Sequence, residues 1–355
     1  MVRVLIAEDS DTARALLVEI LRTDPTVEIV GEARDGLEAV AMTERLRPDV
    51  VTMDIHMPRL DGFGATKEIM IACPTPIVVV SGTDLAAETE TAARALAAGA
   101  LAIIPRPSVR SDNFRRSARE LVSMVKSMAG IKVIRRRRDP DALVRRPLPA
   151  RQGSVRAVAI AASTGGPAAL HAILRELPAT LPVPLLAVQH ITPGFIGGLV
   201  RWLSSASAIR VKLAEDGEPL LPGTLYLAPD GSHLGIAPGV TVSLSGAPPI
   251  GGFRPSADHL FESLGRVFGA RGLGVILTGM GADGLQGLKR LREARGAIVA
   301  QDETSCVVYG MPGVAVAAGL ADAVLPLEAI ARRIVTLATP TVDGLVGVPP
   351  TEQRR

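Results

Sequence analysis

Three residue types that cooperate in nucleophilic catalysis follow apolar runs in the second half of the chain, namely Ser163, His190 and Asp283. A serine hydroxyl becomes a strong nucleophile when an imidazole takes its proton and a carboxylate holds that imidazole in place. Residues far apart in sequence can meet at the carboxyl ends of neighbouring parallel strands. The pattern therefore predicts acyl transfer or hydrolysis at such a sheet edge.

The stretch Ala-Ser-Thr-Gly-Gly-Pro, in which Ser163 lies, allows two interpretations. Gly165 and Gly166 permit a tight turn, and Pro167 suits the first turn of a following helix. Backbone N–H groups in such a turn can hold either a bound anion or the oxyanion formed during acyl transfer. By itself the turn is more typical of anion binding or helix capping than of a nucleophile. It also lacks the Gly-x-Ser-x-Gly motif, and the order Ser, His, Asp differs from that of the α/β-hydrolases.

The base and the carboxylate each have competitors in the sequence. His190 is favoured as the base because it is the histidine that ends an apolar run, and His233, expected in the turn PDGSHLG, is the alternative. Asp283, Asp230 and Asp302 are all expected near strand ends. The glycine-rich sequence around Asp283 favours that residue, because backbone segments must approach one another closely in a crowded site.

A second group of polar residues ends the apolar runs of the first half, namely Glu8, Asp9, Asp54, Ser81 and Arg106. Clustered carboxylates repel one another, and a hard divalent cation such as Mg²⁺ explains such a cluster best. A hydroxyl and a cationic side chain across from it suit a phosphoryl group on Asp54. The alternative is that Glu8 and Asp9 only cap the next helix.

Apolar runs alternate with helical patterns in both halves, which predicts two α/β domains with doubly wound parallel sheets. Helices are expected, for example, over residues 10–23 and 87–99. The expected strands are residues 2–7, 27–33, 49–55, 76–82 and 100–105 in the first half, and residues 155–162, 184–190, 224–230, 274–280 and 297–302 in the second. The predicted division is a first domain over 1–128, a Pro/Arg-rich linker over 129–153, a second domain over 154–345 and a disordered tail over 346–355.

The positive charge of the chain is concentrated in one segment. Residues 130–153 hold eight Lys or Arg and two Asp, a local charge of +6, so with +3 for the whole chain the remainder carries −3. Aromatic residues make up only 3% of the chain, which argues against stacking on nucleic-acid bases. We interpret the segment as a solvated linker, with docking to an acidic partner as the alternative, and expect no nucleic-acid partner.

The composition, together with the lack of a recognisable signal peptide or membrane span in the sequence, predicts a cytoplasmic protein. The apolar fraction of 47% is that of a chain with a sizeable core. The first apolar run is too short for a signal peptide, and no run approaches the roughly 20 residues of a membrane span, so no membrane insertion is expected. Cys73 and Cys306 lack a metal-binding spacing and suit a reducing compartment.

The first domain resembles a response-regulator receiver domain over its full length. The similarity is carried by VLIAEDS at 4–10, DVVTMDIHMPRLDGFGAT at 49–66, VVVSG at 78–82 and the final Arg-Pro at 106–107. It implies a flavodoxin-like fold with a five-stranded parallel sheet and phosphorylation of Asp54 by a histidine kinase. The implied Mg²⁺ ligands are Glu8, Asp9, Asp54 and the backbone carbonyl of His56.

Ser81 and Arg106 are the switch residues that this resemblance implies. Arg106 stands where the family usually has lysine, and Ile103 stands where an aromatic switch residue is common. Arginine keeps the charge of lysine but is bulkier and presents a fork of donors, so the exchange is not neutral.

The second domain resembles the catalytic domain of chemotaxis protein-glutamate methylesterases, the CheB family. The similarity spans about residues 155–340 and is carried by IAASTGGPAAL, VQHITPGF, FRPSADHLFESL, ILTGMGADG and QDETSCVVYGMP. It implies that Ser163 is the nucleophile, His190 the base and Asp283 its orienting carboxylate. The implied residues of the pocket and the oxyanion site are Thr164, Gly165 and Met280. From the residues alone, Met280 could equally fill core.

The two resemblances together imply phosphorylation-activated hydrolysis of glutamate γ-methyl esters on the cytoplasmic helices of chemoreceptors, giving sensory adaptation. Deamidation of receptor glutamines is an expected second activity, and the esterase itself needs no cofactor. The receiver is expected to cover the esterase cleft until Asp54 is phosphorylated. Competing hypotheses are a DNA-binding regulator, which requires a helix-turn-helix domain, and a scaffold that binds receptors without hydrolysis. A dinucleotide site is disfavoured because no Gly-x-Gly-x-x-Gly motif is present.

Overall fold

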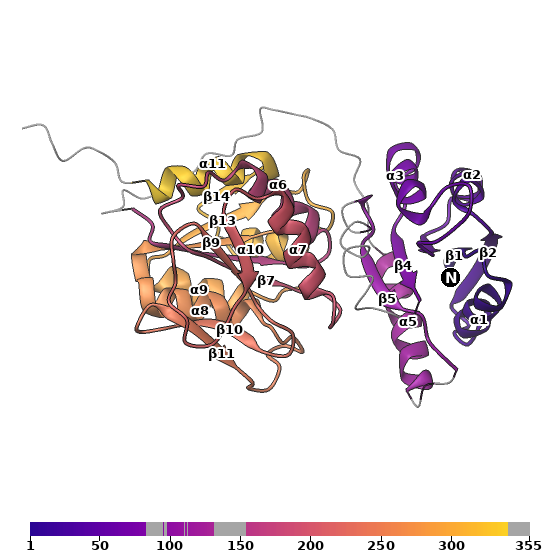
Figure 1. The fold of residues 1–355 in the computed structure, drawn as a ribbon, viewed down its shortest axis with the longest axis horizontal. Helices are drawn as coiled ribbons and strands as arrows, with labels where there is room; N and C mark the ends of the chain where they lie inside the picture. The colour runs from indigo at the N-terminus through magenta and orange to yellow at the C-terminus, as the bar shows by residue number, and fades with distance from the viewer. Residues whose placement is uncertain (83–94, 96–97, 110, 112, 131–153, 340–355) are drawn as a thin grey trace, which may run out of the picture.

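The computed structural model describes every residue except 83–94, 96–97, 110, 112, 131–153 and 340–355. The described residues form two α/β domains (Figure 1). Most of the helix expected over 87–99, nearly all of the linker over 129–153 and the whole tail over 346–355 lie outside the described residues. Within the described parts, no helix combines the length and the apolar character that crossing a bilayer requires.

The first domain is a five-stranded parallel sheet with the strand order β2-β1-β3-β4-β5. All five strands match expected runs, because buried parallel strands are short and rich in β-branched residues. The strands are β1 (Val2–Ala7), β2 (Val27–Ala33), β3 (Val50–Met53), β4 (Ile77–Ser81) and β5 (Ala102–Pro105), and the helices are α1 (Asp11–Arg22), α2 (Gly36–Leu46), α3 (Gly62–Ala72) and α5 (Phe114–Ala129).

Side chains that alternate along these strands pack against helices on opposite faces of the sheet. Val4 and Ile6 lie in one apolar cluster with residues of α1 and α5, while Leu5 and Ala7 lie in another with residues of α2 and α3. Ser10 caps α1 by accepting a hydrogen bond from Ala13 N at 3.4 Å. Ser10, and not Glu8 or Asp9, is therefore the N-cap residue of α1, although Glu8 Oε1 accepts a hydrogen bond from Ser10 N at 3.2 Å.

The second domain is built on a seven-stranded parallel sheet with the order β14-β13-β12-β6-β7-β9-β8. The five expected strands are confirmed as β6 (Ala157–Ala162), β7 (Leu185–Gln189), β9 (Thr224–Leu227), β12 (Gly272–Ile276) and β13 (Ala297–Gln301). The other elements are β8 (Arg210–Leu213), β14 (Ala323–Leu325), the antiparallel pair β10 (His233–Ala237) and β11 (Thr241–Ser245), and the helices α6 (Gly166–Glu176), α7 (Ile196–Ala206), α8 (Ala257–Phe268), α9 (Leu285–Glu293), α10 (Met311–Ala317) and α11 (Leu327–Ala338).

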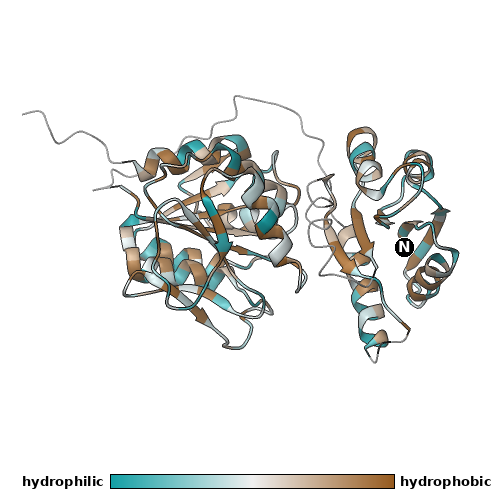
Figure 2. Cartoon of the chain, viewed as in Figure 1, coloured by the Kyte–Doolittle hydropathy of each residue, from teal (hydrophilic) through white to brown (hydrophobic). Residues whose placement is uncertain are grey.

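This sheet is covered on both faces. Helices α6, α7 and α11 pack on one face, and α8, α9, α10 and the β10–β11 hairpin pack on the other. Figure 2 shows the hydrophobic strands running through the interior of the domain. Strand β6 is buried along its whole length, and its alternate residues belong to the two clusters.

Strand order reverses at β6, because the chain proceeds to β7 on one side and returns to β12 on the other. In open α/β sheets, ligands bind beyond the carboxyl ends of the strands at such a reversal. The residues that follow β6, β7 and β12 are therefore those the topology brings together.

Helices α8 and α9 approach closely at Gly287, whose N–H donates to Asp258 Oδ1 at 2.8 Å. A Cβ on Gly287 would lie 2.3 Å from the backbone carbonyl oxygen of Asp258. Gly287→Ala is expected to lower the free energy of unfolding by about 1–3 kcal/mol, because overlap with a backbone atom outweighs the better helix propensity of alanine. Urea unfolding followed by the fluorescence of Trp202, the sole tryptophan, measures this loss.

Gly239→Ala is the matched control, because a Cβ there meets nothing within 4 Å. Its free energy of unfolding is expected to stay within about 0.5 kcal/mol of wild type. Equal unfolding midpoints for the two variants would contradict the close-packing explanation.

Candidate functional site

Ser163 and His190 lie side by side at the end of the β6–β7 ladder. The two strands pair with Ala162 opposite Gln189, and His190 N donates to the carbonyl of Ala162 at 3.0 Å. Ser163 directly follows β6, and His190 directly follows β7. The strand register thus brings the predicted nucleophile and the predicted base to the same sheet edge.

The turn after Ser163 has the conformation that its glycines suggest. Gly165 has a φ of +78°, and a Cβ there would lie 2.6 Å from Val307 Cβ, so a side chain is excluded by conformation and by space. Pro167 lies in the first turn of α6. The backbone N–H groups of Thr164 and Gly165 make no hydrogen bond with any other residue that the structure describes. They are available to an oxyanion at this helix N-terminus.

Asp283 lies against the N-terminus of α8, where its carboxylate accepts several hydrogen bonds. Both carboxylate oxygens of Asp283 accept hydrogen bonds, and Oδ2 also lies 2.9 Å from His190 Nε2. The other donors are Ser256 Oγ at 2.8 Å, Gly284 N at 3.0 Å and Asp258 N at 3.2 Å, all to Oδ1, and Ala257 N at 2.7 Å to Oδ2.

These contacts keep Asp283 ionised. Burial opposes ionisation of the carboxyl group, but the contact with His190 and the hydrogen bonds from Ala257 N and Ser256 Oγ outweigh it, so the pKa of Asp283 lies below its ordinary value. A buried carboxylate that remains charged can orient an imidazole and stabilise its protonated form.

The His190 ring is held between Asp283 and Phe253. Phe253 stacks on it with ring centroids 4.3 Å apart and planes 12° from parallel. Nε2 is at ion-pair distance from Asp283 but not aligned for a linear hydrogen bond, and Nδ1 has no hydrogen-bond partner among the described residues. With Nε2 facing the carboxylate, Nδ1 is left as the atom that can accept a proton.

A cavity of about 590 Å³ opens over this edge and is lined by both domains. Ser163, Thr164, His190 and Met280 line it from the second domain, and Met280 is 44% exposed, so it does not fill core. Within the described chain no hydrogen bond joins Ser163 Oγ to the His190 ring, and catalytic contacts are often loose before substrate binds. From the receiver side, the lining residues are Leu101, Ala102, Ile103, Met124, Ser127 and Met128.

One hydrogen bond ties the receiver to the loop that carries His190. Thr192 Oγ1 donates to the carbonyl of Ile103 at 2.9 Å. Phe195 of the same loop lies in the apolar cluster formed by one face of the receiver sheet. The expected covering of the cleft by the receiver is thus present in this structure.

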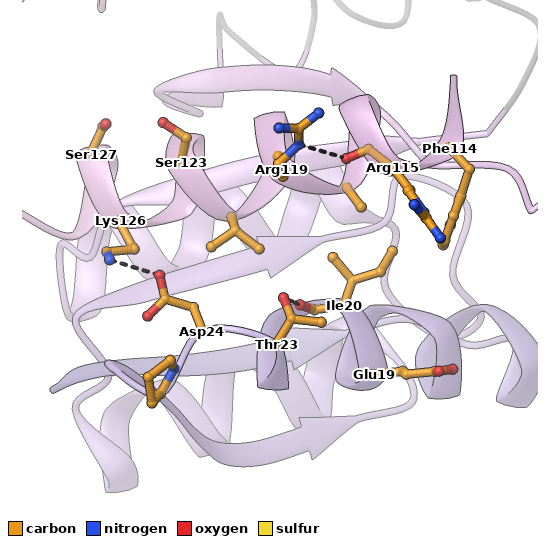
Figure 3. Close-up of a pocket in the computed structure, with 13 residues that line it drawn as sticks. Glu19, Ile20, Thr23, Asp24, Phe114, Arg115, Arg119, Ser123, Lys126 and Ser127 are labelled. Carbon is orange, nitrogen blue, oxygen red and sulfur yellow. Dashed lines mark hydrogen bonds and ion pairs between the residues drawn. The ribbon is translucent and has the colours of Figure 1, made fainter. Parts of the chain in front are cut away.

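A larger hollow, of about 1070 Å³, lies elsewhere, between α1 and α5 of the receiver (Figure 3). Its walls carry mixed charge, and Lys126 donates to Asp24 at 2.8 Å across it. It shares no lining residue with the Ser163 cavity except Ser127. The chemistry of the residues, and not the volume, therefore places the candidate active site in the smaller cavity.

The competing residues have structural roles. His233 begins β10, where a turn was expected; its Nδ1 accepts from Ser256 N at 3.2 Å and its Nε2 lies 3.1 Å from the carbonyl of Pro248. Asp230 accepts from Gly194 N at 2.7 Å. Asp302 accepts from Ser305 N at 2.9 Å. None of these contacts involves Ser163 or His190.

Four further residues support the site, and sequence reasoning assigned none of them a role. Phe253 and Ser256 lie in the motif FRPSADHLFESL and touch His190 and Asp283. The carbonyl of Thr278 accepts from Ser163 N at 3.0 Å. The amide of Gln189 donates to the carbonyls of Ser163 and His190. Their positions within the quoted motifs were the one sign in the sequence that these residues contribute to the site.

The predicted acidic cluster also forms. One carboxylate oxygen each from Glu8, Asp9 and Asp54 lies within 4.8 Å of the others. Arg106 Nη2 lies 3.1 Å from Glu8 Oε2 and 3.2 Å from Asp54 Oδ1. Ser81 is buried at the end of β4, and its carbonyl accepts from Arg106 N at 2.7 Å. This arrangement places one cation opposite three carboxylates.

The cluster has the properties of a site for a hard divalent cation. Burial and the neighbouring charge of Asp54 raise the pKa of Glu8 to about 7, and burial raises that of Asp54. Carboxylates that one arginine compensates only in part are relieved by a bound cation. Oxygen donors are the ligands that Mg²⁺ prefers, so the residues fit this ion. His56 is exposed beside the cluster, and the role of its carbonyl stays a prediction.

The fold and these two sites define a class in which a receiver-type domain is joined to an α/β domain carrying a serine, histidine and aspartate edge. Residues 4–116 match the model of the response regulator receiver domain, and residues 158–334 match that of CheB methylesterase. The chain belongs to the family of protein-glutamate methylesterases/protein-glutamine glutaminases.

The similarity extends over nearly the whole chain. A Myxococcus xanthus protein named protein-glutamate methylesterase/protein-glutamine glutaminase 4 is 54% identical, over 94% of this chain and 96% of its own length. An Anaeromyxobacter dehalogenans relative, numbered 3 under the same name, is 51% identical, over 94% and 98%. The crystal structure of the Thermotoga maritima CheB methylesterase catalytic domain is 39% identical and has a TM-score of 0.50, covering 52% of this chain and 99% of that one.

Proposed function

We propose that this protein hydrolyses glutamate γ-methyl esters on the cytoplasmic helices of chemoreceptors, releasing methanol, and thereby gives sensory adaptation. The observation that carries the proposal is the contact of His190 with a buried, ionised Asp283 beside Ser163, in a cavity at the sheet reversal. The names of the relatives supply the substrate class. Methanol release from methylated receptor membranes by the purified chain is the direct test.

The residues support a double-displacement mechanism. Ser163 Oγ attacks the ester carbonyl carbon while His190 Nδ1 takes the hydroxyl proton, and Asp283 stabilises the imidazolium. The N–H groups of Thr164 and Gly165 bind the oxyanion. The C–O bond to the methoxy group then breaks, and His190 returns the proton to release methanol.

Water completes the cycle. His190 takes a proton from a water molecule that attacks the acyl-enzyme. The bond to Ser163 Oγ then breaks, His190 returns the proton to Ser163 Oγ, and the receptor side chain is left as a glutamate carboxylate. The same residues can attack the primary amide of a glutamine side chain and release ammonia. Deamidation is therefore the second activity that we propose.

Mg²⁺ and phosphorylation belong to the receiver. Glu8, Asp9, Asp54 and the carbonyl of His56 would hold the cation, which when bound neutralises charge on a transferred phosphoryl group. Asp54 would accept the phosphoryl group from a histidine kinase, and Arg106 and Ser81 would contact it. Their support is the carboxylate cluster and the position of Arg106 over it.

Phosphorylation would act by moving the receiver off the esterase cavity. Arg106 follows β5 directly, and β5 residue Ile103 accepts the hydrogen bond from Thr192. Arg106 already contacts Asp54 at 3.2 Å, so a phosphoryl group on Asp54 would change the position of Arg106 and thereby bias β5 and the attached interface toward an open state. The coupling of the two sites would therefore run through one short strand.

Asp54→Asn is expected to abolish stimulation of methanol release by an acyl-phosphate donor with Mg²⁺. Wild type is expected to be stimulated about 5–150-fold, the usual range of allosteric coupling. Basal turnover of the two proteins should be similar, because Asp54 does not line the esterase cavity. Equal stimulation of wild type and variant would contradict regulation through Asp54.

A further inference from the structure

The side-chain amide of Gln189 connects the backbones of the two residues on which the proposed mechanism depends. Gln189 Nε2 donates one hydrogen to the carbonyl of Ser163 and one to the carbonyl of His190, both at 2.8 Å. Gln189 is the last residue of β7 and is only 3% exposed. Both hydrogens of one buried NH₂ group are thus used by the predicted nucleophile and the predicted base.

The orientation of this amide is determined by its partners. A backbone carbonyl can only accept, so the NH₂ end and not the oxygen must face Ser163 and His190. Gln189 Oε1 then lies against Gly166, where a Cβ would come within 2.1 Å of it. The glycine at the start of α6 therefore makes the room that the amide needs.

The backbone hydrogen bonds between β6 and β7 do not extend to the segments that follow Ser163 and His190. The β6–β7 pairing ends at Ala162 and Gln189, and His190 N is the last donor across it. Beyond this point the chain after Ser163 turns into α6, and the chain after His190 runs into the loop before α7. The separation of the two residues needs a further connection, because diverging backbone is free to move.

We propose that Gln189 is a positioning residue that sets the separation of the nucleophile Ser163 from the base His190. The proposal rests on the roles given to Ser163 and His190 in the proposed function. Gln189 acts through the backbones of both residues and takes no part in the chemistry. Without these two donors, the carbonyl of His190 has no hydrogen-bond donor among the described residues, and that of Ser163 keeps only Gly166 N. The side-chain connection between the two chain segments is then lost.

Gln189→Met keeps about the volume of the side chain and removes both donors, whereas Gln189→Glu keeps its shape and can donate at most one hydrogen, when its carboxyl group is protonated. Each is expected to lower kcat for methanol release about 10–100-fold with KM changed by less than about twofold, because a displacement near 1 Å costs rate rather than binding. Two variants of Gln189 are made because the test needs only one of them to fold like wild type. Trp202 fluorescence reports whether each variant is folded.

Tyr226→Phe is the matched control. Tyr226 is 1% exposed on the neighbouring strand β9, and its hydroxyl bridges two backbone groups, donating to Pro219 O at 3.0 Å and accepting from Leu221 N at 2.9 Å. The variant loses the same number of buried hydrogen bonds, at a place remote from Ser163. The kcat of Tyr226→Phe is expected to match that of wild type. An equal loss of kcat in Tyr226→Phe and in the Gln189 variants would overturn the proposal.

A second measurement needs no ester substrate. In a Ser163→Cys background, the pH dependence of alkylation by iodoacetamide at position 163 reports how well His190 supports the thiolate. Peptide mass spectrometry isolates that position from the two native cysteines, which are buried. Adding Gln189→Met is expected to move the midpoint up by about one unit, toward the ordinary thiol value near 8.5, and to slow alkylation at pH 6 about tenfold.

The outcomes separate this inference from the proposed function. Coincident alkylation profiles with and without Gln189→Met would overturn the positioning role. A midpoint near 8.5 in Ser163→Cys alone would instead contradict His190 as the base. Lost methanol release in wild type with an intact alkylation shift would reject the substrate and keep the positioning role.

Discussion

Ser163→Ala is expected to lower kcat for methanol release by about 10³–10⁶-fold, the range over which serine triads depend on their nucleophile. The variant is expected to leave the fold unchanged, because the Ser163 carbonyl accepts one hydrogen bond from Gly166 N and one from Gln189 Nε2, both at 2.8 Å. Neither of them uses the hydroxyl group. Binding of receptor should persist, since only the attacking atom is removed.

The measurement is methanol release from methylated receptor membranes together with sedimentation of the protein with those membranes. Ser205→Ala is the control, because Ser205 is exposed on α7 and, among the residues that the structure describes, its hydroxyl donates only to the carbonyl of Trp202. A scaffold that binds receptors without hydrolysis would show no difference between wild type and Ser163→Ala in either measurement. That result would reject the esterase.

Asp283→Asn is expected to lower kcat by about 10⁴-fold, the effect of leaving a catalytic histidine in the wrong tautomer. Asp283 Oδ1 accepts hydrogen bonds from three donors, so in the variant this position must stay an oxygen. The amide nitrogen is then forced into the place of Oδ2, facing His190 Nε2.

Two consequences follow from that placement. The new NH₂ group meets the N–H of Ala257, which donated to Oδ2 at 2.7 Å, so two donors oppose one another. The NH₂ group also donates to Nε2 of His190, which places the ring proton on Nδ1. The atom that should take the proton of Ser163 then carries one already, and general-base catalysis is lost.

Asp302→Asn is the matched control, because Asp302 is the competing aspartate and accepts only from Thr304 and Ser305 among the described residues. It is expected to keep kcat within about twofold of wild type while lowering stability slightly. A larger loss of kcat in Asp302→Asn than in Asp283→Asn would show that the carboxylate was assigned incorrectly.

Much of this site could be predicted because its residues follow strands whose pattern is local. Ser163 and His190 come directly after buried runs, and parallel strands that end together present the residues after them at one edge. The glycines and the proline after Ser163 predict the turn by their backbone preferences, and Gly165 adopts the positive φ that such a turn requires. Periodicity and turn chemistry are properties of adjacent residues, so they can be recognised without the fold.

Other features could not be predicted because they depend on contacts between distant segments. Strands β8 and β14 are short edge strands, and the β10–β11 hairpin lies apart from the main sheet, so none carries a long apolar run. His233 was expected in a turn but begins β10, where it is fully buried and holds the loop before α8. Phe253 reaches His190 only because that loop folds back over the sheet edge.

The sequence by itself determined the two α/β domains, the acidic cluster on the first and the residue types of the triad on the second, because alternating apolar runs and glycine turns encode local structure. It left Asp283, Asp230 and Asp302 as competing carboxylates and His233 as a competing base. The resemblance of the motifs favoured Asp283 and His190, and in the structure the N-terminus of α8 supplies the donors that keep Asp283 charged against His190. The role of Gln189 also depends on the tertiary structure, because its hydrogen bond to Ser163 forms only when β6 and β7 are paired. Pairing and helix docking are set by packing over the whole domain, and no short stretch of sequence contains that information.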